Sequence, residues 1–217
     1  FNLMNEGVDK ERMFLVGNIM IETLLNNMGK LRRPEILESV DDYIVLTLHR
    51  AENTDNKERL VSIMNGIDGL DTPIIFPVHP RTLQKLKSHG LYEKLERNRN
   101  IRFIKPLTYL EFQYLLSRSR CALTDSGGVQ EEAMVHKVPC LTLRKNTERM
   151  ITLQYGANKL VGTDSNMISG EIGRILKNGY DEWATPPYWD NKVSKRIIDN
   201  VLDHQELLFV PTSDLTV

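Results

Sequence analysis

The stretch YIVLTL at residues 43–48 is an almost unbroken run of apolar and β-branched residues. Strands buried on both faces have this composition, as in a parallel sheet that helices cover on each side. Shorter runs of the same kind recur along the chain. They predict further strands at Met13–Val16, Ile74–Val78, Ile101–Ile104, Cys121–Thr124, Cys140–Leu143 and Lys159–Val161. The strand at 43–48 therefore predicts a sheet that extends through most of the chain.

Segments with helical periodicity lie between these runs. Leucine, isoleucine and methionine recur at spacings of three and four over residues 60–70, so they form one apolar stripe along a helix. A last helix is expected from Val193 to about Leu208, after the proline-rich break at residues 185–188. Strands that alternate with helices through short connections predict an α/β fold with a doubly wound parallel sheet of the Rossmann-like kind.

The composition and motifs argue against several classes of protein. The 217 residues carry 28 Lys and Arg against 29 Asp and Glu, which argues against a protein that binds nucleic acid by neutralising many phosphates. No apolar run reaches the ~18 residues of a membrane-spanning helix, so we expect no membrane segment. The five histidines are scattered without zinc-ligand spacing, so we expect no metal site. A serine-hydrolase GxSxG turn is also missing from the sequence.

The two cysteines and the first residue bear on the origin of the chain. Cys121 and Cys140 both lie in apolar runs, which favours reduced thiols and a cytoplasmic location. The chain opens at Phe1 with neither an initiator methionine nor a signal peptide. We therefore expect it to come from within a longer protein.

Polar residues directly follow the predicted strands. They include histidine, arginine, glycine and carboxylates, in the segments HRAEN at 49–53, HPR at 79–81, KP at 105–106, DSGG at 125–128 and RKNTER at 144–149. In a doubly wound sheet, ligands bind in the crevice beyond the carboxyl ends of the strands. Because these segments meet at that edge, they predict a polar site for an anionic ligand.

The segment DSGGVQEE at 125–132 follows one strand and opens a helix. Its glycines let backbone N–H groups approach an anion, and the helix N-terminus adds unpaired donors. Ser126 could donate to a phosphate oxygen, and Glu132, one turn beyond Gly128, could accept from sugar hydroxyls. Alternatively, Ser126 only caps the helix and the acids complement its dipole. The segment matches neither a P-loop nor the dinucleotide fingerprint GxGxxG.

Histidine and arginine supply the remaining candidates at this edge. His49 could hydrogen-bond a phosphate or exchange a proton, with Arg50 beside it as a fixed cation; the alternative is a solvated polar turn. His79 takes the equivalent place after the next strand. Arg149 could bind phosphate with Glu148 steering it, or the two could form an ordinary surface ion pair.

Four motifs in this order resemble one family, the non-hydrolysing UDP-N-acetylglucosamine 2-epimerases. The matching strings are TLHRAEN at 47–53, PVHP at 77–80, TDSGGVQEE at 124–132 and TER at 147–149. The resemblance covers essentially the whole chain from Asn2 to about Leu208.

The resemblance implies a two-domain GT-B fold with the active site between the domains. This chain looks like its C-terminal half, with residues 1–217 as a single UDP-binding domain and residues 193–217 as its C-terminal helix and tail. The family implies conversion of UDP-N-acetylglucosamine to UDP-N-acetylmannosamine, by elimination of UDP to a 2-acetamidoglucal and re-addition. It also implies a homodimer and no metal or nicotinamide cofactor. A GT-B glycosyltransferase domain and a non-catalytic UDP-sugar-binding module are the competing interpretations.

The resemblance also implies roles for single residues. Ser126, Gly127 and Gly128 would hold the diphosphate of UDP, Glu132 would bind the ribose hydroxyls, and Phe112 matches a uracil-contacting position. The sequence pattern alone favours a core position on a helix for Phe112.

Catalytic and regulatory roles are implied for four further positions. His49 and Arg149 would stabilise charge on the departing UDP. Arg50 and His79 match positions of a possible second, regulatory site for UDP-N-acetylglucosamine, although Ala51 departs from the arginine frequent there. The acidic residues that handle the C2 proton belong to the family's N-terminal domain, which is missing from this chain. We therefore expect the chain alone to be inactive.

Overall fold

The structure, a computed structural model, describes residues 2–204 and divides into two compact units. The larger unit holds residues 29–185. The smaller unit joins the described residues before 29 to those after 185. The expectation that the whole chain is one UDP-binding domain stays a prediction.

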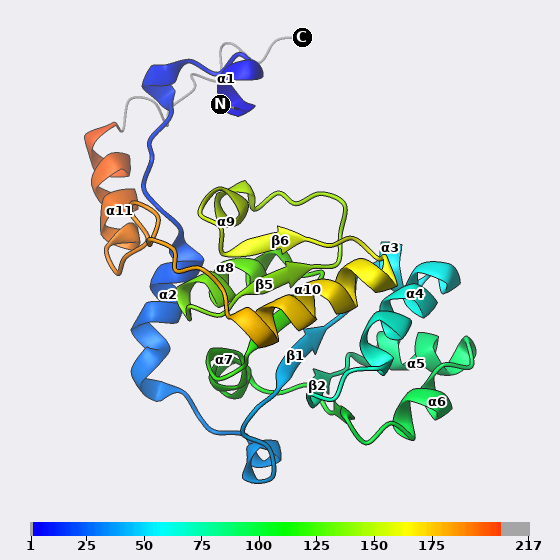
Figure 1. Ribbon diagram of the computed structural model, residues 1–217. Helices are drawn as coiled ribbons and strands as arrows, with labels where there is room; N and C mark the ends of the chain where they lie inside the picture. Colours follow the sequence, from blue (N-terminus) through cyan, green and yellow to red (C-terminus); the bar gives the residue numbers. More distant parts are fainter. Residues whose placement is uncertain (1, 205–217) are drawn as a thin grey trace. The chain divides into compact units, whose positions relative to one another are not determined.

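A parallel sheet of six strands forms the centre of the larger unit (Figure 1). The strands are β1 (Ile44–Thr47), β2 (Ile74–Pro77), β3 (Ile101–Ile104), β4 (Cys121–Thr124), β5 (Cys140–Thr142) and β6 (Asn158–Leu160). Their order in the sheet is β3-β2-β1-β4-β5-β6, and every neighbouring pair is parallel. The chain therefore winds outward from β1 in one direction and then in the other. The prediction of a doubly wound parallel sheet is confirmed.

The helices of the described chain lie between the strands, directly after β6 (α10) or in the smaller unit. They are α1 (Asn2–Asn5), α2 (Ile19–Asn27), α3 (Ala51–Thr54), α4 (Lys57–Asp68), α5 (Pro80–Ser88), α6 (Tyr92–Glu96), α7 (Tyr109–Ser117), α8 (Gly127–Val135), α9 (Met150–Gln154), α10 (Ser165–Asn178) and α11 (Val193–Asp203). Short 3-10 turns cover Lys10–Arg12, Met28–Lys30 and Glu35–Glu38. Through residues 2–204, no helix has both the length and the apolar content needed to cross a bilayer.

The core lies on both faces of the sheet, as the composition of residues 43–48 predicts. Ile44 and Leu46 are fully buried on one face, in the cluster that contains the apolar stripe of α4 and the buried residues of α10. Val45, between them, belongs to a second cluster on the other face with Leu115 of α7. Side chains of successive strand residues point to opposite faces, so this alternation means that helices cover each face of β1.

One strand prediction is wrong. Residues Met13–Val16 are extended but pair with no strand among the described residues of the smaller unit. Leu15 is 76% exposed, so the run lacks the burial that makes an apolar segment a central strand. The other predicted strands form, with bounds that shift by at most one residue at either end, and β3 and β4 keep the predicted bounds.

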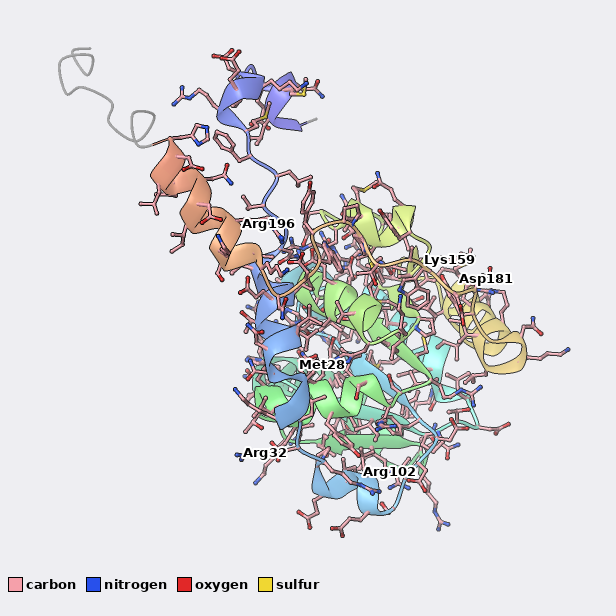
Figure 2. The ribbon with its side chains drawn as sticks, turned by 90° about the vertical axis from the view of Figure 1, so that its left-hand side faces the viewer. Met28, Arg32, Arg102, Lys159, Asp181 and Arg196 are labelled. Atoms are coloured by element: carbon pink, nitrogen blue, oxygen red, sulfur yellow. The ribbon has the colours of Figure 1, made fainter. Side chains whose placement is uncertain are left out.

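The smaller unit packs α2 against α11. Glu22 of α2 accepts hydrogen bonds from the backbone N–H and the hydroxyl of Ser194, at 2.5 and 2.6 Å, and so caps the start of α11. Arg196, labelled in Figure 2, donates to Val16 O at 2.8 Å and pairs with Asp190 at 2.6 Å. The predicted last helix begins at Val193 as expected and α11 ends at Asp203; the predicted end lies outside the described residues.

Candidate functional site

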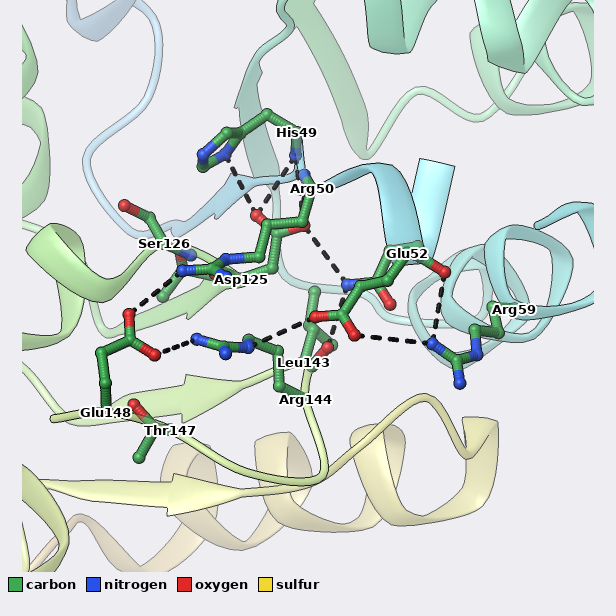
Figure 3. A network of polar contacts seen from close by, with 12 residues as sticks. His49, Arg50, Glu52, Arg59, Asp125, Ser126, Leu143, Arg144, Thr147 and Glu148 are labelled. Atoms are coloured by element: carbon green, nitrogen blue, oxygen red, sulfur yellow. Dashed lines mark hydrogen bonds and ion pairs between the residues drawn. The ribbon is translucent and has the colours of Figure 1, made fainter. Parts of the chain in front are cut away.

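The candidate site lies where the sheet changes winding direction, between β1 and β4. These strands pair in register, with Thr47 opposite Thr124 and their hydroxyls 2.6 Å apart. The residues that follow them, His49 and Arg50 after β1 and Asp125 after β4, therefore meet at the carboxyl edge (Figure 3). The topology brings together predicted residues that are about 75 positions apart in the sequence.

A buried carboxylate organises this edge. Asp125 is fully buried and accepts hydrogen bonds from the N–H groups of His49, at 3.2 Å, and Arg50, at 2.9 Å. The amide of Asn53 donates to the same carboxylate at 3.2 Å and to Leu143 O at 3.0 Å. Asp125 thus fixes the loop after β1. The motif at 125–132 contains this residue but does not reveal its role, because its partners are far away in the sequence.

The His49 imidazole lies between Asp125 and a cavity. Its Nδ1 is 3.1 Å from Asp125 Oδ1, and its side chain is half exposed. The hydrogen bond to Asp125 raises the pKa of His49, against the opposing effects of burial and of Arg50. A cavity of about 230 Å³ is lined by His49, His79, Leu107, Phe112 and their neighbours. Asp125 therefore holds the ring on one side, and the other side of the ring faces the cavity.

The N-terminus of α8 provides the second part of the site. Ser126 is its N-cap and accepts a long hydrogen bond of 3.5 Å from the N–H of Val129. Ser126 therefore does cap the helix, as one of the two interpretations of the sequence expects. Gly127 is buried, and a Cβ there would lie 2.5 Å from Glu148 Oε1 and 3.2 Å from Arg149 Nε. The loop after β5 thus approaches the helix start so closely that a side chain at residue 127 would displace the Glu148 carboxylate. Gly128 follows in the first turn of α8, partly accessible.

A ladder of charged side chains borders the site (Figure 3). Glu148 pairs with Arg50 at 3.1 Å and with Arg144 at 2.8 Å. Glu52 pairs with Arg144 at 3.3 Å and with Arg59 at 3.7 Å. The hydrogen bond from Arg144 is the main reason why the pKa of Glu148 falls to about 2. The ladder keeps the loops after β1 and β5 together and Glu148 ionised.

Arg149 differs from the expectation in its partner. It does not take Glu148, the residue beside it in the sequence, because Glu148 is directed to Arg50 and Arg144. Instead its Nη1 lies 3.5 Å from Oε1 of the buried Glu131 on α8. Its side chain is one-third exposed, and its Nε has no hydrogen-bond partner among the described residues. Because that Nε atom is buried, the exposed third of the side chain is the part of Arg149 that a ligand could reach.

A buried polar network below the site connects α8 to the Arg149 loop. The Gln130 Oε1 accepts from the Thr147 hydroxyl at 2.7 Å and from the Asn158 amide at 3.1 Å. Its Nε2 donates to Ser126 O at 3.1 Å. Thr147 in turn accepts from the Arg149 N–H at 3.0 Å. Sequence reasoning missed Gln130 and Asn158; the only signal was a glutamine inside the motif that follows the glycines.

Glu132 lies on α8, and Phe112 lies on α7 and packs against a cluster that contains residues of α8. Glu132 is half-buried, and burial raises its pKa, with Glu131 adding to the shift and Gln113 opposing it. Phe112 packs partly against two core clusters and also lines the cavity beside His49. Both alternatives for Phe112 are therefore compatible with its position.

The predicted regulatory pair, Arg50 and His79, is engaged separately. Arg50 Nε donates to Asp125 O at 2.8 Å, and its other end holds Glu148. His79 is the N-cap of α5, where its Nδ1 accepts from the Arg81 N–H at 3.3 Å. His79 shares the cavity with His49, whereas Arg50 faces the ladder. The regulatory role of the two stays a prediction.

Comparison with known proteins fits this arrangement. The chain is 43% identical over 208 residues to the UDP-N-acetylglucosamine 2-epimerase of Methanocaldococcus jannaschii, over 91% of this chain and 56% of that protein. It is 40% identical over 172 residues to the UDP-2,3-diacetamido-2,3-dideoxy-D-glucuronate 2-epimerase of Pseudomonas aeruginosa, over 77% of this chain and 47% of that protein. The chain thus spans about half the length of these relatives.

A solved structure and a family model agree with these relatives. The crystal structure of the Methanocaldococcus jannaschii UDP-GlcNAc 2-epimerase in complex with UDP-GlcNAc and UDP superimposes with a TM-score of 0.83 at 43% identity, over 93% of this chain and 58% of that chain. The family model described as UDP-N-acetylglucosamine 2-epimerase matches residues 1–202. The chain therefore belongs to the UDP-N-acetylglucosamine 2-epimerase family.

Proposed function

We propose that this chain is the UDP-binding part of an enzyme that interconverts UDP-N-acetylglucosamine and UDP-N-acetylmannosamine. One observation carries the proposal. Cationic or proton-donating side chains from two loops, His49 after β1 and Arg149 after β5, converge on the glycine-bearing start of α8. Helix N-termini and arginine are the groups that bind phosphate in proteins. This convergence fits a nucleotide diphosphate.

UDP is proposed to lie along α8. The N–H groups of Gly127 and Gly128 and the Ser126 hydroxyl hold the diphosphate at the helix start, where the dipole favours negative charge. Glu132, one turn further along α8, accepts from the ribose hydroxyls. Phe112 contacts uracil from the wall of the cavity.

The proposed reaction is an elimination followed by an addition. A base removes the C2 proton, the C1–O bond breaks, and its electron pair leaves with the β-phosphate oxygen of UDP. The same oxygen then adds back to C1 of the 2-acetamidoglucal while C2 takes a proton on the opposite face. His49 and Arg149 stabilise the charge on the departing diphosphate, which is the point at which preorganised donors accelerate a reaction most.

The C2 proton is handled, by this proposal, outside the chain. The family resemblance assigns that step to acidic residues of an N-terminal domain, and this chain spans only about half the length of its relatives. We therefore propose that the chain alone binds UDP without turnover, and that the complete enzyme is a homodimer.

A second substrate is favoured by the Pseudomonas aeruginosa relative. The substrate that its name gives also carries UDP and an acetamido group, with inversion at C2. The contacts proposed above all go to UDP, so they suit both sugars. The choice between the two depends on groups around the hexose ring.

Deuterium exchange tests the proposed reaction. The chain joined to its N-terminal domain should incorporate deuterium at C2 of UDP-N-acetylglucosamine in D2O, and the chain alone should not. The same assay with the diacetamido glucuronate compares the two substrates. UDP binding without exchange in the joined protein would leave only a binding module or a glycosyltransferase domain.

Replacing Arg149 with alanine should weaken UDP binding by about 10- to 100-fold, since a hydrogen bond to a charged group contributes about 1.5–3 kcal/mol. The loss of stability should be about 1 kcal/mol or less, because the side chain is one-third exposed. Calorimetry and thermal melting measure the two effects. Arg174→Ala on α10 is the matched control, because it removes a partly exposed arginine paired with Glu171 at 3.0 Å. A large drop in melting temperature at unchanged affinity would contradict the prediction.

A further inference from the structure

The carboxylate of Asp125 is more than an anchor for a loop. It has no exposed surface, and every contact of its two oxygens is with a donor on the segment 49–53. An interior carboxylate is stable only when such donors surround it. Backbone N–H groups from His49 and Arg50 fix its position, because they cannot rotate away. A side chain that forms a further hydrogen bond to this fixed carboxylate is therefore also held in a defined position.

The side chain held in this way is the imidazole ring of His49. Asp125 acts only as an acceptor in this arrangement, so the Nδ1 atom 3.1 Å away must carry the hydrogen. The hydrogen bond at one ring nitrogen then sets the state and direction of the other. The His49 side chain is half exposed and lines the cavity with Leu107 and Phe112. Because Nδ1 is bound to Asp125, Nε2 is the ring nitrogen left to meet a ligand there.

We propose that Asp125 is a positioning residue, which holds the His49 imidazole by Nδ1 so that Nε2 faces the cavity as a proton donor to the leaving diphosphate. This assignment rests on the proposed function. Asp125 itself does not touch the nucleotide in this scheme. It acts through His49 and, by its bonds to Arg50 and Asn53, through the shape of the loop.

The charged groups around the His49 ring favour its protonated form, which can donate a proton to the diphosphate. The titratable and charged groups that face His49 are Asp125 across the sheet edge, Arg50 beside it in the chain and His79 in the wall of the cavity. The pKa of His49 is raised, first by the hydrogen bond to Asp125 and also by the charge of that carboxylate, although burial and Arg50 act to lower it. The imidazolium, with both nitrogens donating, therefore persists to higher pH than in an ordinary histidine. UDP binding should weaken as the pH rises through this pKa.

NMR titration of the chain with labelled histidine tests the assignment without any ligand. In the unaltered chain, the neutral His49 ring should carry its proton on Nδ1. Asp125→Asn keeps the size of the side chain and removes its charge, so the pKa of His49 should fall. Asp55→Asn is the matched control. It removes the same charge from the residue that follows helix α3, where the carboxylate pairs with Arg81 and Lys85 and not with His49, so the His49 titration should not change.

Calorimetry at several pH values separates this inference from the proposed function. Titration of the UDP phosphate affects both proteins alike, so the comparison is between the unaltered chain and Asp125→Asn. The variant should bind UDP several-fold more weakly near neutral pH, and the difference should shrink at high pH. An unchanged His49 titration in the variant, with UDP still bound, overturns the positioning role alone. An altered titration without UDP binding to either protein overturns the proposed function alone.

If Asp125→Asn does not fold, the histidine NMR of the unaltered chain still tests the assignment. If its neutral His49 ring carries the proton on Nε2 instead of Nδ1, Asp125 does not hold the ring as inferred, and the assignment is wrong.

Discussion

A Ser126→Ala, Glu132→Ala double variant should bind UDP at least 100-fold more weakly than the unaltered chain, by an estimate of about 1.5–3 kcal/mol for each contact to a charged group. The serine is the N-cap of α8, and the carboxylate of Glu132 lies six residues further along the helix. They are proposed to hold different parts of the nucleotide, the diphosphate and the ribose. Their losses should therefore add, and calorimetry measures the sum.

The stability of the double variant should change little. The capping bond from Val129 N to Ser126 is long, at 3.5 Å, so its loss should cost about 1 kcal/mol or less. Burial raises the pKa of Glu132, so removal of this carboxylate relieves a desolvated charge. Asp164→Ala, which removes the N-cap of α10, is the matched control and should leave UDP binding unchanged. Unchanged affinity in the double variant would mean that Ser126 only caps its helix.

Gln130→Ala should lower both the stability of the larger unit and its affinity for UDP. Gln130 is fully buried, and its removal leaves the hydroxyl of Thr147, the amide of Asn158 and the carbonyl of Ser126 without this partner. Buried polar groups that lose a partner cost about 1–3 kcal/mol each, so the free energy of unfolding should fall by about 3 kcal/mol. Affinity should fall by about tenfold, because Thr147 no longer orients the Arg149 loop.

A stability control separates the two effects of Gln130. The Asn98 amide donates to the backbone and the side chain of Asp68, at 2.7 and 3.1 Å, on the connection that enters β3. Asn98→Ala should therefore lower the melting temperature without affecting UDP binding. If Gln130→Ala behaves in the same way, the network stabilises the fold but does not position Arg149.

The fold was largely predictable because its central strands are buried on both faces. Such strands are apolar at nearly every residue, so their runs are visible without knowledge of their partners. Strand ends are less visible. Tyr43 and Leu48 continue the apolar run but lie outside β1, where packing buries them and the Tyr43 hydroxyl donates to Leu115 O at 2.8 Å. Residues 13–16 show the reverse error, an apolar run without a neighbouring strand.

The candidate site was predictable where it depends on topology alone. The rule that parallel strands end at one edge is enough to bring His49 and Ser126 near the same place. The connecting residues were not predictable, because they pair across long separations: Asp125 with His49, and Gln130 with Asn158. Glu148 and Arg149 do not pair with each other as expected, because side chains of neighbouring residues in a chain need not point the same way. Glu148 faces the ladder and Arg149 faces Glu131.

The two cysteines of the chain lie on neighbouring strands, Cys121 on β4 and Cys140 on β5, and both are free and fully buried. Burial raises the pKa of both thiols, that of Cys140 to about 12, so almost no thiolate is present near neutral pH. Alkylating reagents react with the thiolate. A cysteine introduced in place of the exposed Met150, next to Arg149, would thus take a maleimide fluorophore selectively. The two native cysteines would not have to be replaced first, and the fluorophore beside Arg149 would report whether a nucleotide is bound.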